Sequence, residues 1–311
     1  MKQIPVWIDC DPGVDDAAAF LLAQSLPELK IVGVSTVAGN APLDKTTRNA
    51  LRLRDLMGED FPVHPGADGP LRRPYLNGAD FHGADGLGGA YLPEPSGAPE
   101  KLPAWDGLQK AAEEYGEELY VLTMGPLTNL ALAFGKYPDL PEKIGKVIMM
   151  AGSITKGNRT PCAEYNVYAD PEAAQSVFRS GAALTMCGLE VTEEAYLTRE
   201  DLEKIGTLHT KKSDFFYSAS GRILEKNLAN GHKGFCVHDA VTVFFAAHPE
   251  YFTGASAGVF VETQGELTLG KTVCDLNTDR KFDRKNAFLP LTIDREAFRD
   301  ALTKAMKDHE L

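Results

Sequence analysis

The chain has 311 residues, of which 43% are hydrophobic and 24% charged, a composition that fits a globular protein with a large core. Its formal net charge of -12 argues against a basic track for nucleic acids and favours small neutral ligands or cations. Five scattered cysteines without a CxxC pair predict neither a zinc site nor a disulfide framework. We find neither a signal peptide nor an apolar run approaching about 18 residues, and we therefore expect a cytoplasmic protein with no membrane partner.

The first half of the chain alternates apolar, strand-like runs with amphipathic, helix-like runs. The expected strands are residues 4–8, 29–36, 119–124, 146–150 and 184–187. The expected helices are residues 15–24, 43–57, a helix beginning at residue 128, and 173–178. This order is typical of an α/β fold with a mostly parallel central β-sheet and helices on both faces, in which ligands bind at the carboxyl ends of the strands.

The second half is less regular. Residues 198–227 are expected to form two helices and residues 237–247 a third, while residues 259–269 suggest a hairpin that turns at Gln264-Gly265. A late strand at 286–293 and a last helix at 294–307, with Asp294 as its N-cap, complete the pattern. Residues 66–103 are rich in Gly and Pro, and a loop of that length is usually functional or mobile. We see no linker or internal repeat and predict a single domain spanning residues 1–311.

The densest chemical signal follows the first expected strand. Asp9, Asp11, Asp15 and Asp16 lie within the eight residues Asp9-Cys10-Asp11-Pro12-Gly13-Val14-Asp15-Asp16. Acidic residues favour a helix N-terminus, which could account for Asp15 and Asp16 but not for the other two. Four carboxylates in one tight turn repel one another, and a hard divalent cation such as calcium or magnesium would relieve that repulsion. The motif therefore predicts a metal site.

Other polar residues recur after the expected strands, and each could be a turn or capping residue when considered alone. They are Asn40, Asn129, Asn158, Glu164 and Asn166. Their repeated position indicates a polyhydroxylated ligand such as a sugar, because each hydroxyl both donates and accepts a hydrogen bond. His238-Asp239 opens an apolar helix and could be an incidental pair, or a proton donor beside another oxygen ligand. His82, on the long loop, is a further candidate that spacing leaves undecided.

These segments together resemble the inosine-uridine nucleoside hydrolase family over most of the chain. The opening acidic motif is the most specific, and the segments that support it are Gly39-Asn40, Phe81-His82-Gly83, Asp85-Gly86-Leu87-Gly88, Gly125-Pro126-Leu127-Thr128-Asn129, Glu164-Tyr165-Asn166, Asp170-Pro171-Glu172-Ala173-Ala174, His238-Asp239 and Gly270-Lys271-Thr272-Val273-Cys274-Asp275. The resemblance implies a Rossmann-like nucleoside hydrolase fold and hydrolysis of the N-glycosidic bond of ribonucleosides to ribose and free nucleobase. It also implies a role in nucleoside salvage and a homodimer or homotetramer.

The resemblance implies a calcium ion (Ca²⁺) held by four oxygen donors, namely the carboxylates of Asp11, Asp16 and Asp239 and the backbone carbonyl of Met124. It implies five side chains that bind the ribose, namely Asp15, Asn40 and Asn166 at the 2′- and 3′-hydroxyls and Asn158 and Glu164 at the 5′-hydroxyl. Asp11 would also be the general base for the attacking water, and His238 would give a proton to the departing base. His82 is assigned to substrate binding, and Asp9 is interpreted as a support for the turn.

One residue departs from the family pattern, and the residues around the base cannot be assigned from it. Ala240 stands where the family often has Pro after His-Asp, which a helix start tolerates. We expect residues 215–223, which begin with Phe215-Phe216-Tyr217, to supply aromatic groups around the base, and residues 66–103 and 211–230 to close over it. This expectation leaves the base preference open.

Two alternative functions are a magnesium-dependent phosphohydrolase and a non-catalytic binding protein. A magnesium-dependent phosphohydrolase with an Asp-x-Asp nucleophile fits poorly, because Pro12-Gly13 follows the pair and Asp15-Asp16 would repel a phosphate. A non-catalytic ribose- or nucleoside-binding protein could use the same polar cleft but seldom needs a metal beside a water-activating carboxylate. The variant Asp11→Asn separates them, because only an enzyme has turnover to lose.

Overall fold

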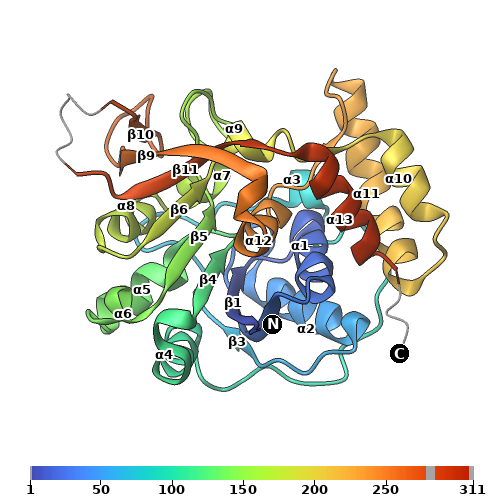
Figure 1. The fold of residues 1–311 in the computed structure, drawn as a ribbon, viewed down its shortest axis with the longest axis horizontal. Helices are drawn as coiled ribbons and strands as arrows, with labels where there is room; N and C mark the ends of the chain where they lie inside the picture. The colour runs from blue at the N-terminus through green and yellow to red at the C-terminus, as the bar shows by residue number, and fades with distance from the viewer. Residues whose placement is uncertain (1, 278–283, 308–311) are drawn as a thin grey trace.

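Strand β1 (Ile4–Cys10) lies in the interior of a nine-stranded β-sheet and leads directly to the acidic motif (Figure 1). The computed structural model describes residues 2–277 and 284–307. Residues 5–10 of β1 are all buried, and the strand is hydrogen-bonded to a parallel neighbour on each side. Strands that are covered on both faces have nearly continuous apolar sequences, because every side chain is buried. This is why β1 contains so few polar residues before Asp9.

The sheet is parallel over most of its width. Its order is β10 (Thr272–Asp275), β9 (Phe252–Val261), β11 (Ala287–Ile293), β6 (Leu184–Cys187), β5 (Lys146–Met150), β4 (Tyr120–Thr123), β1, β2 (Leu29–Thr36) and β3 (Val63–Pro65). The strands from β11 to β3 run in one direction, and β9 pairs antiparallel with both of its neighbours. The carboxyl ends of β1, β2, β4 and β5 therefore meet at one edge.

Helices cover both faces of the sheet (Figure 1), and each face of the sheet has its own hydrophobic cluster. One face carries α1 (Val14–Ser25), α2 (Leu43–Met57), α10 (Arg199–Gly206), α11 (Lys211–Ala229), α12 (Ala240–Ala247) and α13 (Arg295–Ala305). The other face carries α4 (Ala104–Tyr115), α5 (Thr128–Lys136), α6 (Leu140–Lys143) and α8 (Pro171–Arg179). The predicted α/β fold, with a mostly parallel central sheet between two helical layers, is confirmed.

Several short elements surround the carboxyl ends of the strands. They are α3 (Ala79–His82), α7 (Tyr165–Ala169), α9 (Leu189–Thr192) and a separate two-stranded sheet of β7 (Tyr196–Leu197) and β8 (Phe235–Cys236). Two 3₁₀ turns, Gly116–Glu118 and Pro249–Tyr251, precede β4 and β9. The expected long loop at 66–103 contains α3 and otherwise no regular helix or strand. These short elements shape the cavity described below.

Some predicted boundaries were wrong. The hairpin joins β9 to β10, so its return strand begins at Thr272, after the connection 262–271. The backbone N–H groups of Gln264 and Gly265 donate to Glu262 Oε1, which forms a local turn there without a returning strand. Helix α12 begins at Ala240, later than predicted, because the chain leaves β8 at Cys236 and turns at His238 and Asp239 before the helix starts. Helix α4 and strand β3 were not predicted.

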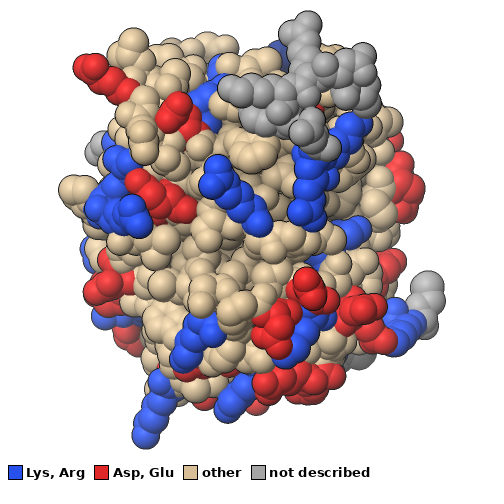
Figure 2. Space-filling view, turned by 90° about the vertical axis from the view of Figure 1, so that its left-hand side faces the viewer, with Lys and Arg blue, Asp and Glu red and all other residues tan. Residues whose placement is uncertain are grey.

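The described residues contain no helix with both the length and the apolar character needed to cross a membrane. On the face shown in Figure 2, acidic and basic side chains are interspersed, and the described residues form no continuous basic track there.

Candidate active site

A cavity of about 760 Å³ opens where the carboxyl ends of the central strands meet. The predicted site residues that line it are Asp15, Asn40, His82, Met124, Asn158, Glu164, Asn166, His238 and Asp239. The remaining two, Asp11 and Asp16, are fully buried and do not line it. Segments distant in the sequence thus converge on one cavity of the size that encloses a small ligand.

The turn after β1 fixes the carboxylates of Asp11 and Asp16. Asp16 Oδ2 accepts a hydrogen bond from the backbone N–H of Gly13 at 2.7 Å, and Asp11 Oδ2 accepts one from the backbone N–H of Asn40 at 2.6 Å. A Cβ atom on Gly39 would lie 1.9 Å from Asp11 Oδ2, and one on Gly125 would lie 2.8 Å from Asp11 Oδ1. Only glycines allow the two strand ends to approach this carboxylate so closely.

Asp9 stands behind this turn and belongs to a separate buried network. Its Oδ1 accepts hydrogen bonds from Ser35 Oγ and from Asn129 Nδ2, and Asn129 Oδ1 accepts one from the backbone N–H of Ala67. Asn129 Nδ2 also donates to the carbonyl of Thr36 at the end of β2. Asp9 and Asn129 therefore join β1, β2 and the start of the 66–103 segment.

The acidic side chains form a cluster with unsatisfied oxygens. Oxygens of Asp15, Asp16 and Asp239 lie within 4.8 Å of one another, although Asp239 comes from the start of α12. The Oδ1 atoms of Asp11, Asp15 and Asp16 are buried and have no hydrogen-bond partner among the described residues. Two like charges about 5 Å apart repel by roughly 3 kcal/mol at an effective dielectric constant of about 20. Buried carboxylate oxygens of this kind are the ligands that hard divalent cations prefer, so these residues fit such an ion.

The pKa values of these carboxyls reflect the same crowding. Burial raises the pKa of Asp15 to about 6 and, with the nearby charge of Asp15, that of Asp16 to about 7. Burial, followed by the charges of neighbouring aspartates, raises the pKa of Asp11 and of Asp239 well above the usual range. Protonation and cation binding are thus alternative ways of neutralising the cluster.

Three of the groups predicted to bind ribose, Asn158, Glu164 and Asn166, line the cavity from the segment that follows β5. Glu164 is the N-cap of α7 and accepts from the backbone N–H groups of Gly152, Asn166 and Val167, and burial raises its pKa to about 7. Asn158, exposed at the rim, accepts from the backbone N–H of Tyr165. Glu164 is thus already held by three backbone donors, which fix its orientation.

The carbonyl of Met124, predicted as a metal ligand, lies beside one of these amides. Asn166 Nδ2 donates to this carbonyl at 2.8 Å and to the carbonyl of Met150 at 3.0 Å. A carbonyl oxygen has two lone pairs, so this contact leaves Met124 one lone pair for a cation.

Two histidines share the cavity. The backbone N–H of Val14 donates to His82 Nδ1 at 3.3 Å, and the same atom lies 3.8 Å from Asp15 Oδ1. His238 Nδ1 lies 2.9 Å from Thr192 Oγ1 at the end of α9. Burial lowers the pKa of each imidazole to about 4, and for His238 the proximity of His82 contributes. Both rings are therefore neutral near pH 7 and act as hydrogen-bonding groups rather than cations.

The aromatic residues of the cavity are not those predicted. Phe215 and Phe216 are buried in the core, and no residue from 215 to 223 lines the cavity, so that prediction was wrong. On an amphipathic helix such a pair faces the core, and α11 reaches the cavity about three turns later, with Lys226 and Asn227. The aromatic lining consists of Phe81, Tyr165 and Tyr196.

Two further polar side chains at the site, Tyr165 and Thr192, were not predicted from the sequence. The hydroxyl of Tyr165 lies 2.9 Å from the carbonyl of Gly39 and 3.0 Å from that of Leu76, and so links α7 to the long loop over the cavity. Tyr165 lies inside the quoted Glu164-Tyr165-Asn166 segment, so its position gave a signal. Thr192 gave none, because its contact with His238 depends on the fold.

The sequence profile of the inosine-uridine preferring nucleoside hydrolase family matches residues 6–300. The chain is 40% identical to the pyrimidine-specific ribonucleoside hydrolase RihA of Citrobacter koseri over 311 residues, covering 97% of this chain and 98% of that protein. It is 38% identical to the protein of the same name in Escherichia coli K12, with 98% of each chain covered. The chain belongs to the inosine-uridine preferring nucleoside hydrolase family.

Solved structures agree with this assignment. A plant nucleoside hydrolase superposes with a TM-score of 0.91 at 32% identity, covering 97% of this chain and 98% of the other. A purine-preferring ribonucleoside hydrolase from Gardnerella vaginalis superposes with the same TM-score at 29% identity and the same coverage. The protein is accordingly a ribonucleoside hydrolase, an enzyme that cleaves N-glycosidic bonds, and neither the phosphohydrolase nor the non-catalytic alternative is supported.

Proposed function

We propose that the enzyme hydrolyses pyrimidine ribonucleosides, with Ca²⁺ bound at the acidic cluster, and that it serves nucleoside salvage. The observation that carries the calcium proposal is the set of buried, unpartnered oxygens of Asp11, Asp15 and Asp16 beside Asp239. The pyrimidine preference is supported by relatives 38–40% identical that are named pyrimidine-specific. The purine-preferring structural neighbour is more distant, at 29% identity.

The proposed calcium ligands are the carboxylates of Asp11, Asp16 and Asp239 and the carbonyl of Met124. Asp15 is assigned to the ribose, although its carboxylate lies within reach of the same ion. When bound, the ion neutralises the cluster and makes a water molecule easier to deprotonate. The difference between Asp11 and Asp15 is testable, because loss of a ligand weakens calcium binding whereas loss of a ribose contact weakens substrate binding.

The ribose would lie beside the acidic cluster, within reach of Glu164 and of the amide side chains that line the cavity. Asp15, Asn40 and Asn166 are proposed to bind the 2′- and 3′-hydroxyls, and Asn158 and Glu164 the 5′-hydroxyl. Cleavage of the N-glycosidic bond develops positive charge on the ribosyl ring, as in other glycoside hydrolysis. Fixed carboxylates and amide oxygens around the ring stabilise that charge without reorganising.

Two groups are proposed to move protons. The Oδ1 atom of Asp11, which has no hydrogen-bond partner, takes a proton from the attacking water, while its Oδ2 atom stays bound to the backbone N–H of Asn40. His238 is proposed to supply a proton to the departing base, and because its resting ring is neutral near pH 7 it would first take up that proton from solvent. Its ring nitrogen Nδ1 is bound to Thr192, which leaves Nε2 as the nitrogen for the base. His82 is proposed to contact the substrate from α3.

The family resemblance supports the proposal that the enzyme is a homodimer or homotetramer, and its site of action is proposed to be the cytoplasm. Light scattering coupled to size exclusion would measure the mass in solution, and a monomer at micromolar concentration would refute the assembly.

The reaction is tested by measuring release of reducing sugar from uridine, cytidine, inosine and adenosine, with calcium and after chelation. We expect ribose release that is fastest with uridine and cytidine, is lost on chelation and returns with added calcium. Undiminished rates in fully chelated protein would refute calcium dependence, and faster cleavage of inosine or adenosine would refute the pyrimidine preference.

A further inference from the structure

The two-stranded sheet β7–β8 joins the cavity wall to the C-terminal helix. Tyr196 pairs with Cys236 across this sheet, and both residues line the cavity. The chain continues from β8 through Val237, whose N–H donates to the carbonyl of Ala195 at 3.0 Å, into His238 and Asp239. The position of β7 therefore determines where the last two residues stand.

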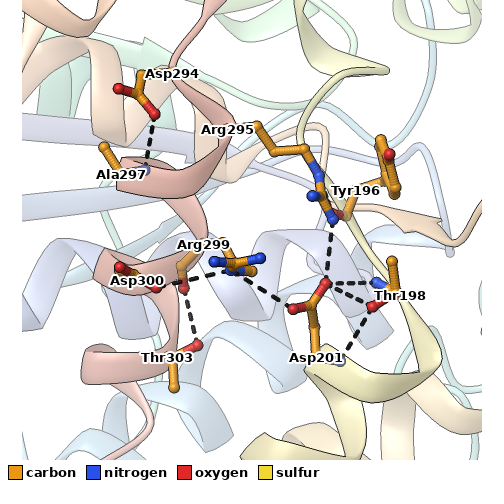
Figure 3. A network of polar contacts seen from close by, with 9 residues as sticks. All are labelled: Tyr196, Thr198, Asp201, Asp294, Arg295, Ala297, Arg299, Asp300 and Thr303. Carbon is orange, nitrogen blue, oxygen red and sulfur yellow. Dashed lines mark hydrogen bonds and ion pairs between the residues drawn. The ribbon is translucent and has the colours of Figure 1, made fainter.

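Arg295, the first residue of α13, contacts Tyr196 of β7 (Figure 3). Its Nε and Nη2 donate to the carbonyl of Tyr196 at 3.2 and 3.0 Å. Its guanidinium carbon lies 3.9 Å from the centroid of the Tyr196 ring. A planar guanidinium can make these contacts together, whereas the ammonium of a lysine cannot.

The guanidinium is itself held in place. Arg295 Nη2 pairs with Asp201 Oδ2 at 3.1 Å, and the same Oδ2 accepts from the N–H and hydroxyl of Thr198 at the start of α10 (Figure 3). Arg299, one turn further along α13, lies 3.6 Å from Asp201 Oδ1, and neither its hydrogen bonds nor its ion pairs involve Tyr196. The two arginines thus share an ion-pair partner and differ in their contact with the cavity wall.

We propose that Arg295 is a positioning residue for the reaction, which acts through Tyr196 and β8 on the cavity wall and on the His238-Asp239 segment. It lines no part of the cavity and so touches neither substrate nor metal. The inference rests on the proposed function of this site, because it takes Asp239 as a calcium ligand and His238 as a group at the base. Small displacements of such groups have large kinetic effects, and a shift of about 1 Å can cost roughly 100-fold.

The test compares Arg295→Ala with the matched control Arg299→Ala. For each protein we would measure the melting temperature, KM and kcat for the best nucleoside, and the calcium dissociation constant by titration calorimetry. We expect Arg295→Ala to raise KM and the calcium dissociation constant by about 10-fold or more. Arg299→Ala should lower the melting temperature but keep wild-type values of both constants.

A purely structural role would lower the melting temperature of both variants and leave both constants at wild-type values, which would overturn the proposal. If Arg295→Ala does not fold, Arg295→Lys decides, because lysine can keep the ion pair with Asp201 but not the paired bonds and stacking at Tyr196. Wild-type constants in Arg295→Lys would then overturn it. Failure of wild-type protein to hydrolyse nucleosides would instead refute the proposed function, and the calorimetric comparison would still stand.

Discussion

Replacing Asp11 by asparagine removes the proposed general base with little change of shape. The side chain is enclosed by Gly39 and Gly125, and the isosteric amide fits the same space. Its carbonyl oxygen can still accept from the backbone N–H of Asn40, as Oδ2 does now. We therefore expect Asp11→Asn to fold.

The expected kinetic effect is large, because an amide cannot take the proton of the attacking water. A general base typically contributes about 10²–10⁴-fold, which corresponds to roughly 3–5 kcal/mol in the activation barrier. Asp11 also carries a buried oxygen with no partner, so its neutral replacement should weaken calcium binding and stabilise the calcium-free protein. Measuring kcat at saturating calcium separates the loss of the base from the loss of a ligand.

The assay is the rate of reducing-sugar release from uridine at saturating calcium and substrate. Asp294→Asn is the matched control, because Asp294 caps α13 through the backbone N–H of Ala297 and asparagine is an equally good N-cap. The control should keep wild-type kcat. A kcat for Asp11→Asn within about threefold of wild type would refute the assignment of the base.

Three other predictions concern the buried aspartates, Thr192 and Glu164. In chelated protein the folded-state pKa values of Asp15 and Asp16, about 6 and 7, exceed the ordinary 3.8, so the folded state binds protons more tightly. The melting temperature should therefore rise as pH falls from 8 to 5 and should not do so with saturating calcium; a fall in the chelated sample would contradict this. Thr192→Val should lower kcat for uridine about 10-fold with little change in KM, because it removes the hydroxyl beside His238. Thr192→Ser keeps that hydroxyl and should keep the wild-type kcat. Equal kcat values for wild type and both variants would show that the contact with His238 has no kinetic role. Glu164→Gln should lower kcat/KM about 10-fold for uridine but not for 5′-deoxyuridine, and equal losses on both would indicate that Glu164 acts only as the cap of α7.

The parts of the fold that were predicted are those in which local sequence decides the structure. Residues 5–8 of β1 and 147–150 of β5 are buried and continuously apolar, and Asp294 was identified as an N-cap because its side chain bonds only three residues ahead. The return strand of the β9–β10 hairpin was predicted at the wrong residues, because its pairing with β9 depends on the whole sheet and not on the local sequence. Helix α4 was missed because its amphipathic pattern directly follows the Gly- and Pro-rich segment 66–103.

The same distinction holds for the site. The acidic motif is compact in sequence, so Asp11, Asp15 and Asp16 could be proposed as a group. Asp239 lies beside these aspartates, and Thr192 beside His238, only because of the way α12 and α9 pack in the fold. No local sequence pattern predicts that packing. Phe215 and Phe216 illustrate the opposite error, because their aromatic character suggested the cavity while their helical face directs them to the core.

The central claim is that calcium at the acidic cluster is required for nucleoside hydrolysis. The most direct test is to titrate calcium into chelated protein while measuring bound calcium by calorimetry and uridine hydrolysis in parallel samples. The account predicts one calcium per chain at this cluster, with a rate that rises in proportion to occupancy, and a much weaker calcium affinity in Asp239→Asn. Full hydrolysis without bound metal, or unchanged calcium affinity in Asp239→Asn, would contradict it.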